Sequence, residues 1–203
     1  MWHEIHSFLF KNQTTRQTIA KNTFWQFVAQ IGSRAIRAVI VIYAARVLGA
    51  ENYGVFSYAI GFAALFAILS DVGIDQITTR EIAKENLQKE KIISSAFYLK
   101  IALSAFAYVL IIIGAVKFTP IAASRVLIPL LGFALIMDTL RQFGLAIIRA
   151  FEKMQIEAGI LIFNSVANLI LGGAALLYWK TPLALAIAYA LASTSGFLGI
   201  AYY

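Results

Sequence analysis

Six long apolar segments occupy most of this chain and leave little of it to fold in any other way. Each is about 20 or more residues long, the length that an α-helix needs to cross a hydrocarbon core of about 30 Å. Unpaired backbone groups cost several kcal/mol in lipid, so such segments must be helical. The sequence therefore predicts an all-α fold, a polytopic membrane bundle of six transmembrane helices. The expected spans are residues 24–48, 53–72, 92–116, 121–148, 156–178 and 183–203.

Composition supports a membrane protein and excludes several other classes. Apolar residues make up 61% of the chain and charged residues only 13%, whereas soluble domains carry about 25% charged residues. There is no cysteine, which excludes a disulfide framework, a thiolate zinc site and a cysteine nucleophile. The first 21 residues are polar and lack the apolar core of a signal peptide. We expect residues 1–203 to form one transmembrane domain in the cell (inner) membrane.

Basic residues are distributed unevenly between the two sides of the expected spans. Lysine and arginine concentrate in the cytoplasmic loops of membrane proteins. Nine lie on the side of the N-terminus, namely Lys11, Arg16, Lys21, Arg80, Lys84, Lys89, Lys91, Arg149 and Lys153, against four on the other, namely Arg46, Lys117, Arg125 and Lys180. We therefore expect the N-terminus, the even loops and the C-terminus in the cytoplasm. The net charge of +7 reflects this bias, and no nucleic-acid partner is expected.

Turn-forming residues mark the breaks between spans. Gly49 and Gly54 bracket the first predicted loop, and Asp71 and Gly73 end the second span. The next helices are expected to begin near two prolines, Pro120 and Pro182. Pro129 lies inside the fourth segment, so that helix is either kinked there or begins later than residue 121.

The second loop has two interpretations. Residues 75–91 mix apolar side chains, among them Ile77 and Ile82, with eight charged ones. This pattern suits a short helix that lies in the cytoplasmic interface. Alternatively, Ile77 and Ile82 extend the ends of the neighbouring spans.

Two arginines, Arg34 and Arg37, lie near the middle of the first span. Each central arginine costs about 2.5–3.5 kcal/mol on insertion, against about 0.3–0.6 kcal/mol gained per aliphatic residue. Membrane helices retain such residues where they face a bundle interior or a wet cavity, so they indicate a functional site. They belong to a polar stripe with three- and four-residue steps, which places it on one helix face. The stripe consists of Asn22, Gln26, Gln30, Ser33, Arg34 and Arg37.

The chemistry of these arginines allows two roles. The planar guanidinium donates two parallel hydrogen bonds that match phosphate oxygens. Two guanidinium groups one turn apart would clamp a phosphate or a pyrophosphate. In the alternative, Arg34 and Arg37 are structural and pair with Asp138 and helix carbonyls.

The fourth and fifth spans carry further polar residues. The fourth has a stripe of Asp138, Arg141, Gln142, Leu145 and Arg149. Asp138 either neutralises Arg141 one turn away or pairs with Arg34 or Arg37, in which case its protonation would free an arginine. Asn164 and Asn168 either bind sugar hydroxyls or join helices. The candidate substrate-binding residues are Gln30, Arg34, Arg37, Asp138, Arg141, Asn164 and Asn168.

Small residues on two of the spans favour close helix packing, and the sequence lacks motifs that are typical of enzymes. Gly196, Gly199, Ser57 and Gly61 permit helices to approach closely. The only histidines lie in the N-terminal tail, so no zinc-protease motif or serine–histidine–aspartate site can be built. No nucleotide-binding glycine loop or acidic metal motif is present. Neither an enzyme nor a cofactor or metal is expected.

Three motifs near the N-terminus resemble those of a known family. The first and second spans join through Ala-Arg-Val-Leu-Gly-Ala-Glu-Asn-Tyr-Gly-Val-Phe at residues 45–56. The second span ends in Asp-Val-Gly-Ile at 71–74, with Thr-Arg-Glu at 79–81, and Lys-Asn-Thr at 21–23 leads into the first span. The chain resembles the N-terminal part of bacterial polysaccharide flippases, the Wzx-type oligosaccharide–lipid transporters of the multidrug/oligosaccharidyl-lipid/polysaccharide exporter superfamily.

The resemblance implies a function and a partner. Such proteins flip polyprenyl-pyrophosphate-linked saccharides across the membrane through a cationic cavity between two six-helix lobes, and Arg34 and Arg37 would lie on its wall. The expected partners are membrane lipid and the lipid-linked saccharide. Six spans correspond to one lobe, so we expect a partial chain, or a lobe that needs a second lobe or a homodimer. The alternatives are a multidrug-type exporter of the same superfamily and a non-transporting membrane assembly protein.

Overall fold

The structure is a computed structural model that describes residues 15–84 and 88–202, with side chains from residue 23 onward. Over these residues the fold is an all-α bundle, as predicted. Its elements are α2 (Thr15–Ala67), the 3-10 helix η1 (Ile68–Ser70), α3 (Ile74–Ala83), α4 (Lys89–Lys117), α5 (Ser124–Ala150), α6 (Met154–Tyr178) and α7 (Pro182–Tyr202). In this part of the chain, five helices are long and apolar enough to cross a membrane. The multi-pass helical membrane fold is therefore confirmed.

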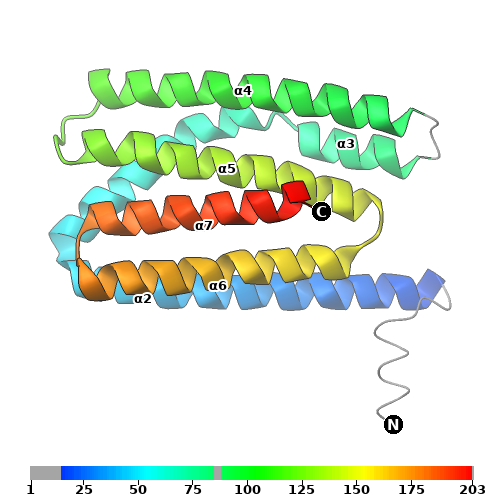
Figure 1. Cartoon of the computed structure of the whole chain (residues 1–203), viewed down its shortest axis with the longest axis horizontal. Coiled ribbons are helices and arrows are strands. Elements are labelled where there is room, and N and C mark those ends of the chain that lie inside the picture. The colour runs from blue at the N-terminus through cyan, green and yellow to red at the C-terminus, as the bar shows by residue number, and fades with distance from the viewer. Residues whose placement is uncertain (1–14, 85–87, 203) are drawn as a thin grey trace, which may run out of the picture.

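The first two predicted spans are two helices that meet at a sharp turn, and both carry the label α2. The apolar stretch Thr23–Ser70 has 48 residues, which at about 1.5 Å per residue is more than twice the thickness of a hydrocarbon core. Gly49 alone departs from helical geometry, with φ 74° and ψ 172°, and a glycine adopts this conformation without steric cost. The chain reverses direction there, from the blue to the cyan part of α2 (Figure 1). The predicted break at Gly49 is therefore correct, but the connection is shorter than residues 49–54, because Gly54 is already helical.

The other predicted boundaries are mostly close to those observed. Pro182 is the first residue of α7, and Asp71 and Gly73 follow the end of the second span. By contrast, α5 begins only at Ser124. The fourth helix thus begins later than predicted, and Pro129 lies in its second turn, where a proline removes one hydrogen bond without ending the helix.

The connections fall at two opposite ends of the bundle (Figure 1). The start of α2, the α3–α4 turn and the α5–α6 turn lie at one end, which we call the N-terminal end. The kink at Gly49, the α4–α5 turn and the α6–α7 turn lie at the other, the Gly49 end. Loops that the sequence assigns to the same side of the membrane thus share an end. Which end faces the cytoplasm remains a prediction, and Lys11 lies outside the described residues.

Two apolar clusters hold the bundle together. One joins the second half of α2 to α4, α5 and α7 through Ala63, Ile111, Leu131 and their neighbours. The other joins the first half of α2 to α6 and α7 through buried alanine and leucine side chains. Glycine permits some of this close packing, because a Cβ at Gly132 would lie 2.7 Å from Ile111 Cγ2. At Gly61 and Gly199 a Cβ would meet nothing within 4 Å, so the predicted close approach is absent at these two positions.

The segment after the second span forms a separate short helix, α3, which lies alongside α4 and α5 (Figure 1). Ile74 and Ile82 are buried, whereas Ile77 is 62% exposed. The Thr79 hydroxyl donates a hydrogen bond to the Ala146 carbonyl of α5 at 3.1 Å. Ile74–Ala83 thus forms a helix of its own that is anchored to the bundle. The first interpretation was correct in expecting a short helix, and its position in the cytoplasmic interface stays a prediction. Residues 85–87 lie outside the described part.

Candidate functional site

Polar side chains from four helices lie near the middle of their spans. They are Arg37 on α2, Asp138 and Arg141 on α5, Asn164 and Asn168 on α6, and Tyr189 on α7. Polar groups at this depth must face one another or a cavity. Substrate sites of many membrane transporters lie close to the bilayer midplane. Tyr189 was not among the candidates, because a tyrosine in an apolar helix is not by itself an unusual residue.

Asp138 is held by two neighbours. Arg141 Nη2 lies 3.0 Å from Asp138 Oδ1, and the Tyr189 hydroxyl donates to Asp138 Oδ2 at 2.9 Å. The Arg141 side chain is only 3% exposed, so this is a buried pair. Of the alternatives for Asp138, the pairing with Arg141 is correct and a pairing with Arg34 or Arg37 is wrong. The i,i+3 spacing favours Arg141 because it brings the two groups together on one helix.

The arginines of the first span are exposed in this chain. Arg34 and Arg37 both lie on the surface of the bundle, and among the described residues neither forms an ion pair. The interpretation of these arginines as structural partners of Asp138 was therefore wrong. Their guanidinium groups are available to an anion.

The polar stripe on the first span divides into two parts. Gln26 turns toward α6, where its amide donates to Glu157 Oε2 at 3.0 Å. Gln30, Arg34 and Arg37 remain exposed. The side chain of Asn22 lies outside the described part. The stripe is thus tied to the bundle near the N-terminal end and open further along the helix.

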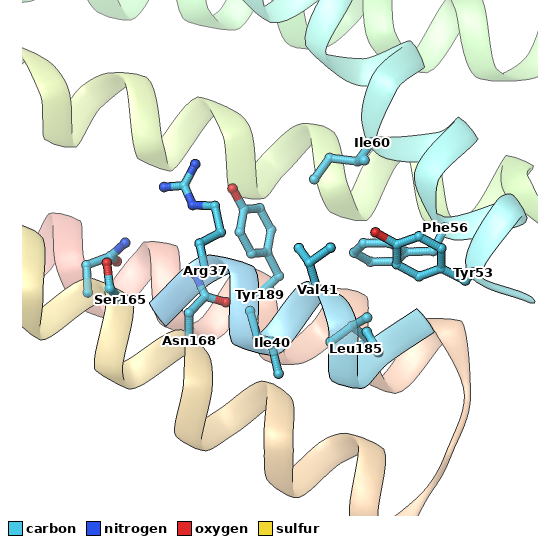
Figure 2. A pocket seen from close by; sticks show the side chains of 12 residues that line it. Arg37, Ile40, Val41, Tyr53, Phe56, Ile60, Ser165, Asn168, Leu185 and Tyr189 are labelled. Carbon is cyan, nitrogen blue, oxygen red and sulfur yellow. The ribbon is translucent and has the colours of Figure 1, made fainter. Parts of the chain in front are cut away.

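A pocket of about 160 Å³ lies between α2, α6 and α7. Figure 2 shows that its lining is divided: Arg37, Ser165, Asn168 and the Tyr189 hydroxyl lie toward one end. Tyr53, Phe56, Ile60 and Leu185 lie toward the other, with Ile40 and Val41 between them. Ala44 and Asn164 complete the lining. The structure thus brings Arg37, Asn164 and Asn168 together, whereas Gln30 and Arg34 do not line this pocket.

Asn164 is positioned by close helix packing. It is 5% exposed, and a Cβ on Gly196 would lie 2.5 Å from Asn164 Oδ1 and 2.9 Å from Arg141 Cδ. Only a glycine leaves room for both side chains at this point of α7. Gly172, one turn beyond Asn168, lets the Ile40 side chain of α2 approach in the same way. Helix α6, which carries both asparagines, therefore packs closely against its neighbours and also forms a wall of the pocket.

A second polar cluster lies between α3, α4 and α5 and was missed in the sequence. Lys100 is completely buried, and its ammonium lies 2.8 Å from Asp75 Oδ1 and 3.1 Å from Asp71 Oδ1. These residues line a pocket of about 240 Å³ together with Gln142 and Arg149. A single lysine in the middle of an apolar span has the same insertion cost that singles out Arg34 and Arg37. That criterion would have found Lys100.

The surroundings of Asp75 in this cluster affect its protonation. Burial raises the pKa of Asp75 above its ordinary value, and the nearby Asp71 carboxylate acts in the same direction. The hydrogen bond from Lys100 opposes this effect without cancelling it. Asp75 therefore takes up a proton more readily than a free aspartate.

A third ion pair ties the helices at the N-terminal end. Arg149 Nη2 lies 2.6 Å from Glu157 Oε1, and the Glu157 side chain is 1% exposed. Because Gln26 also donates to Glu157, this carboxylate joins α2, α5 and α6. The pair leaves Arg149 engaged, so it is not a free cation within the bundle.

The comparisons with known proteins identify a family. Residues 19–203 match the family model described as polysaccharide biosynthesis protein, which covers most of the chain. The chain belongs to this family, and it has a role in polysaccharide biosynthesis as a multi-pass membrane protein. The comparisons with curated proteins and with solved structures give no match.

Proposed function

We propose that this member of the polysaccharide biosynthesis protein family is a flippase that moves a polyprenyl-pyrophosphate-linked oligosaccharide across the cell membrane. In this proposal the chain is a transporter and not an enzyme. Arg34 and Arg37 bind the phosphate groups, and the polar residues of α6 next to Arg37 contribute to the same site.

The observation that carries this proposal is a difference between the cations of the bundle. Lys100, Arg141 and Arg149 are each neutralised by a carboxylate within 3.1 Å. Arg34 and Arg37, like Lys100 and Arg141, lie well inside a span, and within the described residues no carboxylate neutralises them. An unneutralised guanidinium pair in a membrane favours an anionic ligand with oxygens that accept two hydrogen bonds, such as a phosphate.

The same comparison disfavours the export of cationic drugs. A cation site would need an acid that is free to face the substrate. Among the described residues no acid lines the pocket of Arg37, and in Asp138, which contacts the lining residue Tyr189, both oxygens are already occupied by Arg141 and Tyr189. An anionic substrate is therefore the better match to the charges that line this part of the bundle.

Complementation of a flippase-deficient strain tests the proposal. Arg34→Ala and Arg37→Ala should each abolish complementation while the level of folded protein stays near that of the wild type. Lysine at either position keeps the charge but loses the two parallel hydrogen bonds, so it should restore activity only in part. Arg46→Ala is the matched control, because Arg46 is exposed on the same half of α2 but does not line the pocket. Wild-type activity in the Arg34→Ala/Arg37→Ala double variant would exclude the proposed role.

The exposed arginines also require a cover. In lipid, an uncovered stripe of Gln30, Arg34 and Arg37 would be strongly unfavourable. We propose that a second lobe, supplied by another copy of this chain or by other protein, faces this side of α2. The chain has no cysteine, and Ile31 is 51% exposed on this helix. A cysteine introduced by Ile31→Cys can therefore be cross-linked to the same cysteine of a second copy by a bifunctional maleimide in membranes.

The cross-linking experiment distinguishes a second copy of this chain from other protein as the second lobe. A second copy should give a covalent dimer through Ile31→Cys. Val109→Cys should give none, because Val109 is equally exposed, at 52%, but lies on α4, on the opposite side of the bundle from the first half of α2 (Figure 1). Absence of a dimer in both variants would exclude a second copy as the cover.

A further inference from the structure

The pocket beside Arg37 has chemically different ends, and this division identifies the part of the substrate that it fits. We infer that the pocket binds the junction between phosphate and isoprenoid in the lipid carrier: Arg37 takes the phosphate, and the apolar end takes the first isoprene unit. This inference rests on the proposed function, and it assigns the lipid rather than the sugar to this pocket.

The polar end of the pocket suits a phosphate at its mouth. Arg37 is exposed, so a phosphate that it binds would lie at the mouth of the pocket and not in its interior. Asn168 lies near Arg37 in the pocket (Figure 2), and its amide can donate to phosphate oxygens, whereas the proton of the nearby Tyr189 hydroxyl is donated to Asp138. A single cation with one neutral donor beside it favours one phosphate group at this position.

The apolar end of the pocket suits a short branched hydrocarbon. Phe56 and Ile60 come from the second half of α2, and Val41 and Ile40 come from the first half. The kink at Gly49 folds the two halves of α2 against each other, so the pocket depends on this turn. The Tyr53 and Phe56 rings are stacked, with centroids 6.5 Å apart, and form a flat wall.

The size of the pocket limits its occupant. Its volume of about 160 Å³ suits a short branched hydrocarbon such as one isoprene unit, while the phosphate stays at the mouth. A complete oligosaccharide is far too large for it.

A sugar ring would fit the lining less well. Its hydroxyl groups point outward around the whole ring, so some of them would face Ile40, Ile60 and Leu185. Polar groups that lose water without gaining a hydrogen bond are strongly disfavoured. The isoprenoid end has no such groups, and its burial against these side chains is favourable.

The experiment compares three anions of similar charge on the purified chain in detergent micelles. They are dimethylallyl phosphate, which has one isoprene unit, glucose 1-phosphate and inorganic phosphate, with binding followed by phosphorus NMR. Dimethylallyl phosphate should bind at least tenfold more tightly than either of the others. Val41→Trp fills the apolar end and should remove this preference while binding of inorganic phosphate is retained. Arg37→Ala should weaken binding of all three.

The control variant lies two residues away on the same helix. Val39 is 56% exposed and Val41 is 43% exposed, but Val39 does not line the pocket, so Val39→Trp should leave all three affinities unchanged. Val41→Phe provides a smaller filler with the same expected effect, and helicity is checked for each variant. Equal binding of the three anions, tighter binding of glucose 1-phosphate, or an unchanged preference in a folded Val41 variant would overturn the inference.

Complementation keeps this inference distinct from the proposed function. A chain that complements the flippase-deficient strain but shows no preference for dimethylallyl phosphate would overturn only the assignment of the pocket. A chain that shows the preference and fails to complement would instead overturn the proposed transport.

Discussion

The Tyr189 hydroxyl donates a hydrogen bond to Asp138 at 2.9 Å, and this contact links α7 to α5 in the middle of the bundle. The other carboxylate oxygen of Asp138 is paired with Arg141. Asp138 therefore has a structural role in this arrangement. It pairs with the buried Arg141 and not with the exposed Arg34 and Arg37, which we assign to the substrate.

The difference between the paired Arg141 and the unpaired Arg37 predicts a large loss of stability on one substitution and a small change on the other. Arg141→Ala leaves Asp138 without its ionic partner and should destabilise the protein by about 3–5 kcal/mol. Arg37→Ala removes an exposed side chain without an ion pair and should change stability by no more than about 0.5 kcal/mol. Unfolding titrations in mixed micelles measure both values. A large loss of stability in Arg37→Ala would mean that Arg37 is structural.

The Lys100 cluster predicts coupled substitutions. Lys100→Met keeps most of the side-chain volume but leaves Asp71 and Asp75 without a cation, so it should destabilise the bundle by about 3–5 kcal/mol. Adding Asp75→Asn removes one of the uncompensated charges and should recover part of this loss, with a coupling of about 0.5–3 kcal/mol. The same unfolding titration measures the double-mutant cycle. Strict additivity would show that Lys100 and Asp75 do not interact.

The raised pKa of Asp75 predicts how stability changes with pH. Burial holds the folded-state pKa above the ordinary 3.8, so the folded protein binds this proton more tightly than the unfolded chain does. The resulting stabilisation is complete below pH 3.8 and is lost as the pH rises through the folded-state pKa. Asp75→Asn should flatten this part of the profile, measured as the thermal unfolding midpoint between about pH 4 and 7.

Glu81→Gln is the control for this pH profile. Glu81 lies on the same helix, and its pKa is lowered by the hydrogen bond from Lys84. Its stabilising contribution is present at neutral pH and is lost as the pH falls, which is the opposite sign. Glu81→Gln should therefore not flatten the decline, and an Asp75→Asn profile parallel to that of the wild type would contradict the assignment.

Two glycines of α7 predict different responses to a methyl group. At position 196 a Cβ would lie 2.5 Å from Asn164 Oδ1, whereas at position 199 it would meet nothing within 4 Å. Gly196→Ala should displace Asn164 and destabilise the protein by about 1–3 kcal/mol, as overpacking typically does. Gly199→Ala should be neutral or slightly stabilising, because alanine is the better helix former. Equal thermal midpoints for the two variants would argue against this packing.

The arrangement of the bundle ends predicts the results of topology reporters. Glu51 and Lys180 flank turns at the Gly49 end, and Lys89 begins α4 at the N-terminal end (Figure 1). With the N-terminal end in the cytoplasm, alkaline phosphatase fused after Glu51 or Lys180 should be active. The same enzyme fused after Lys89 should be inactive. The reverse pattern would place Arg34 and Arg37 in the opposite orientation to the one that the basic residues predict.

Much of this molecule could be predicted from local sequence. The length of the apolar segments fixes the membrane helices, because a continuous apolar segment of about 20 residues satisfies its own backbone groups in lipid as an α-helix. The spacing of Asp138 and Arg141 suffices to predict their pairing, because residues three apart share a helix face. The placement of Arg34 and Arg37 in mid-span likewise follows from the order of residues along one helix.

The tertiary structure decided what the helices share. The kink at Gly49 depends on one backbone conformation, which the sequence allows at several glycines. The contacts of Lys100 with Asp71 and Asp75, and of Tyr189 with Asp138, join different helices, and helical periodicity carries no information about which faces meet. Periodicity therefore determined which residues lie on one face of each helix, whereas packing alone decided that Arg37, Asn168 and Tyr189 line one pocket.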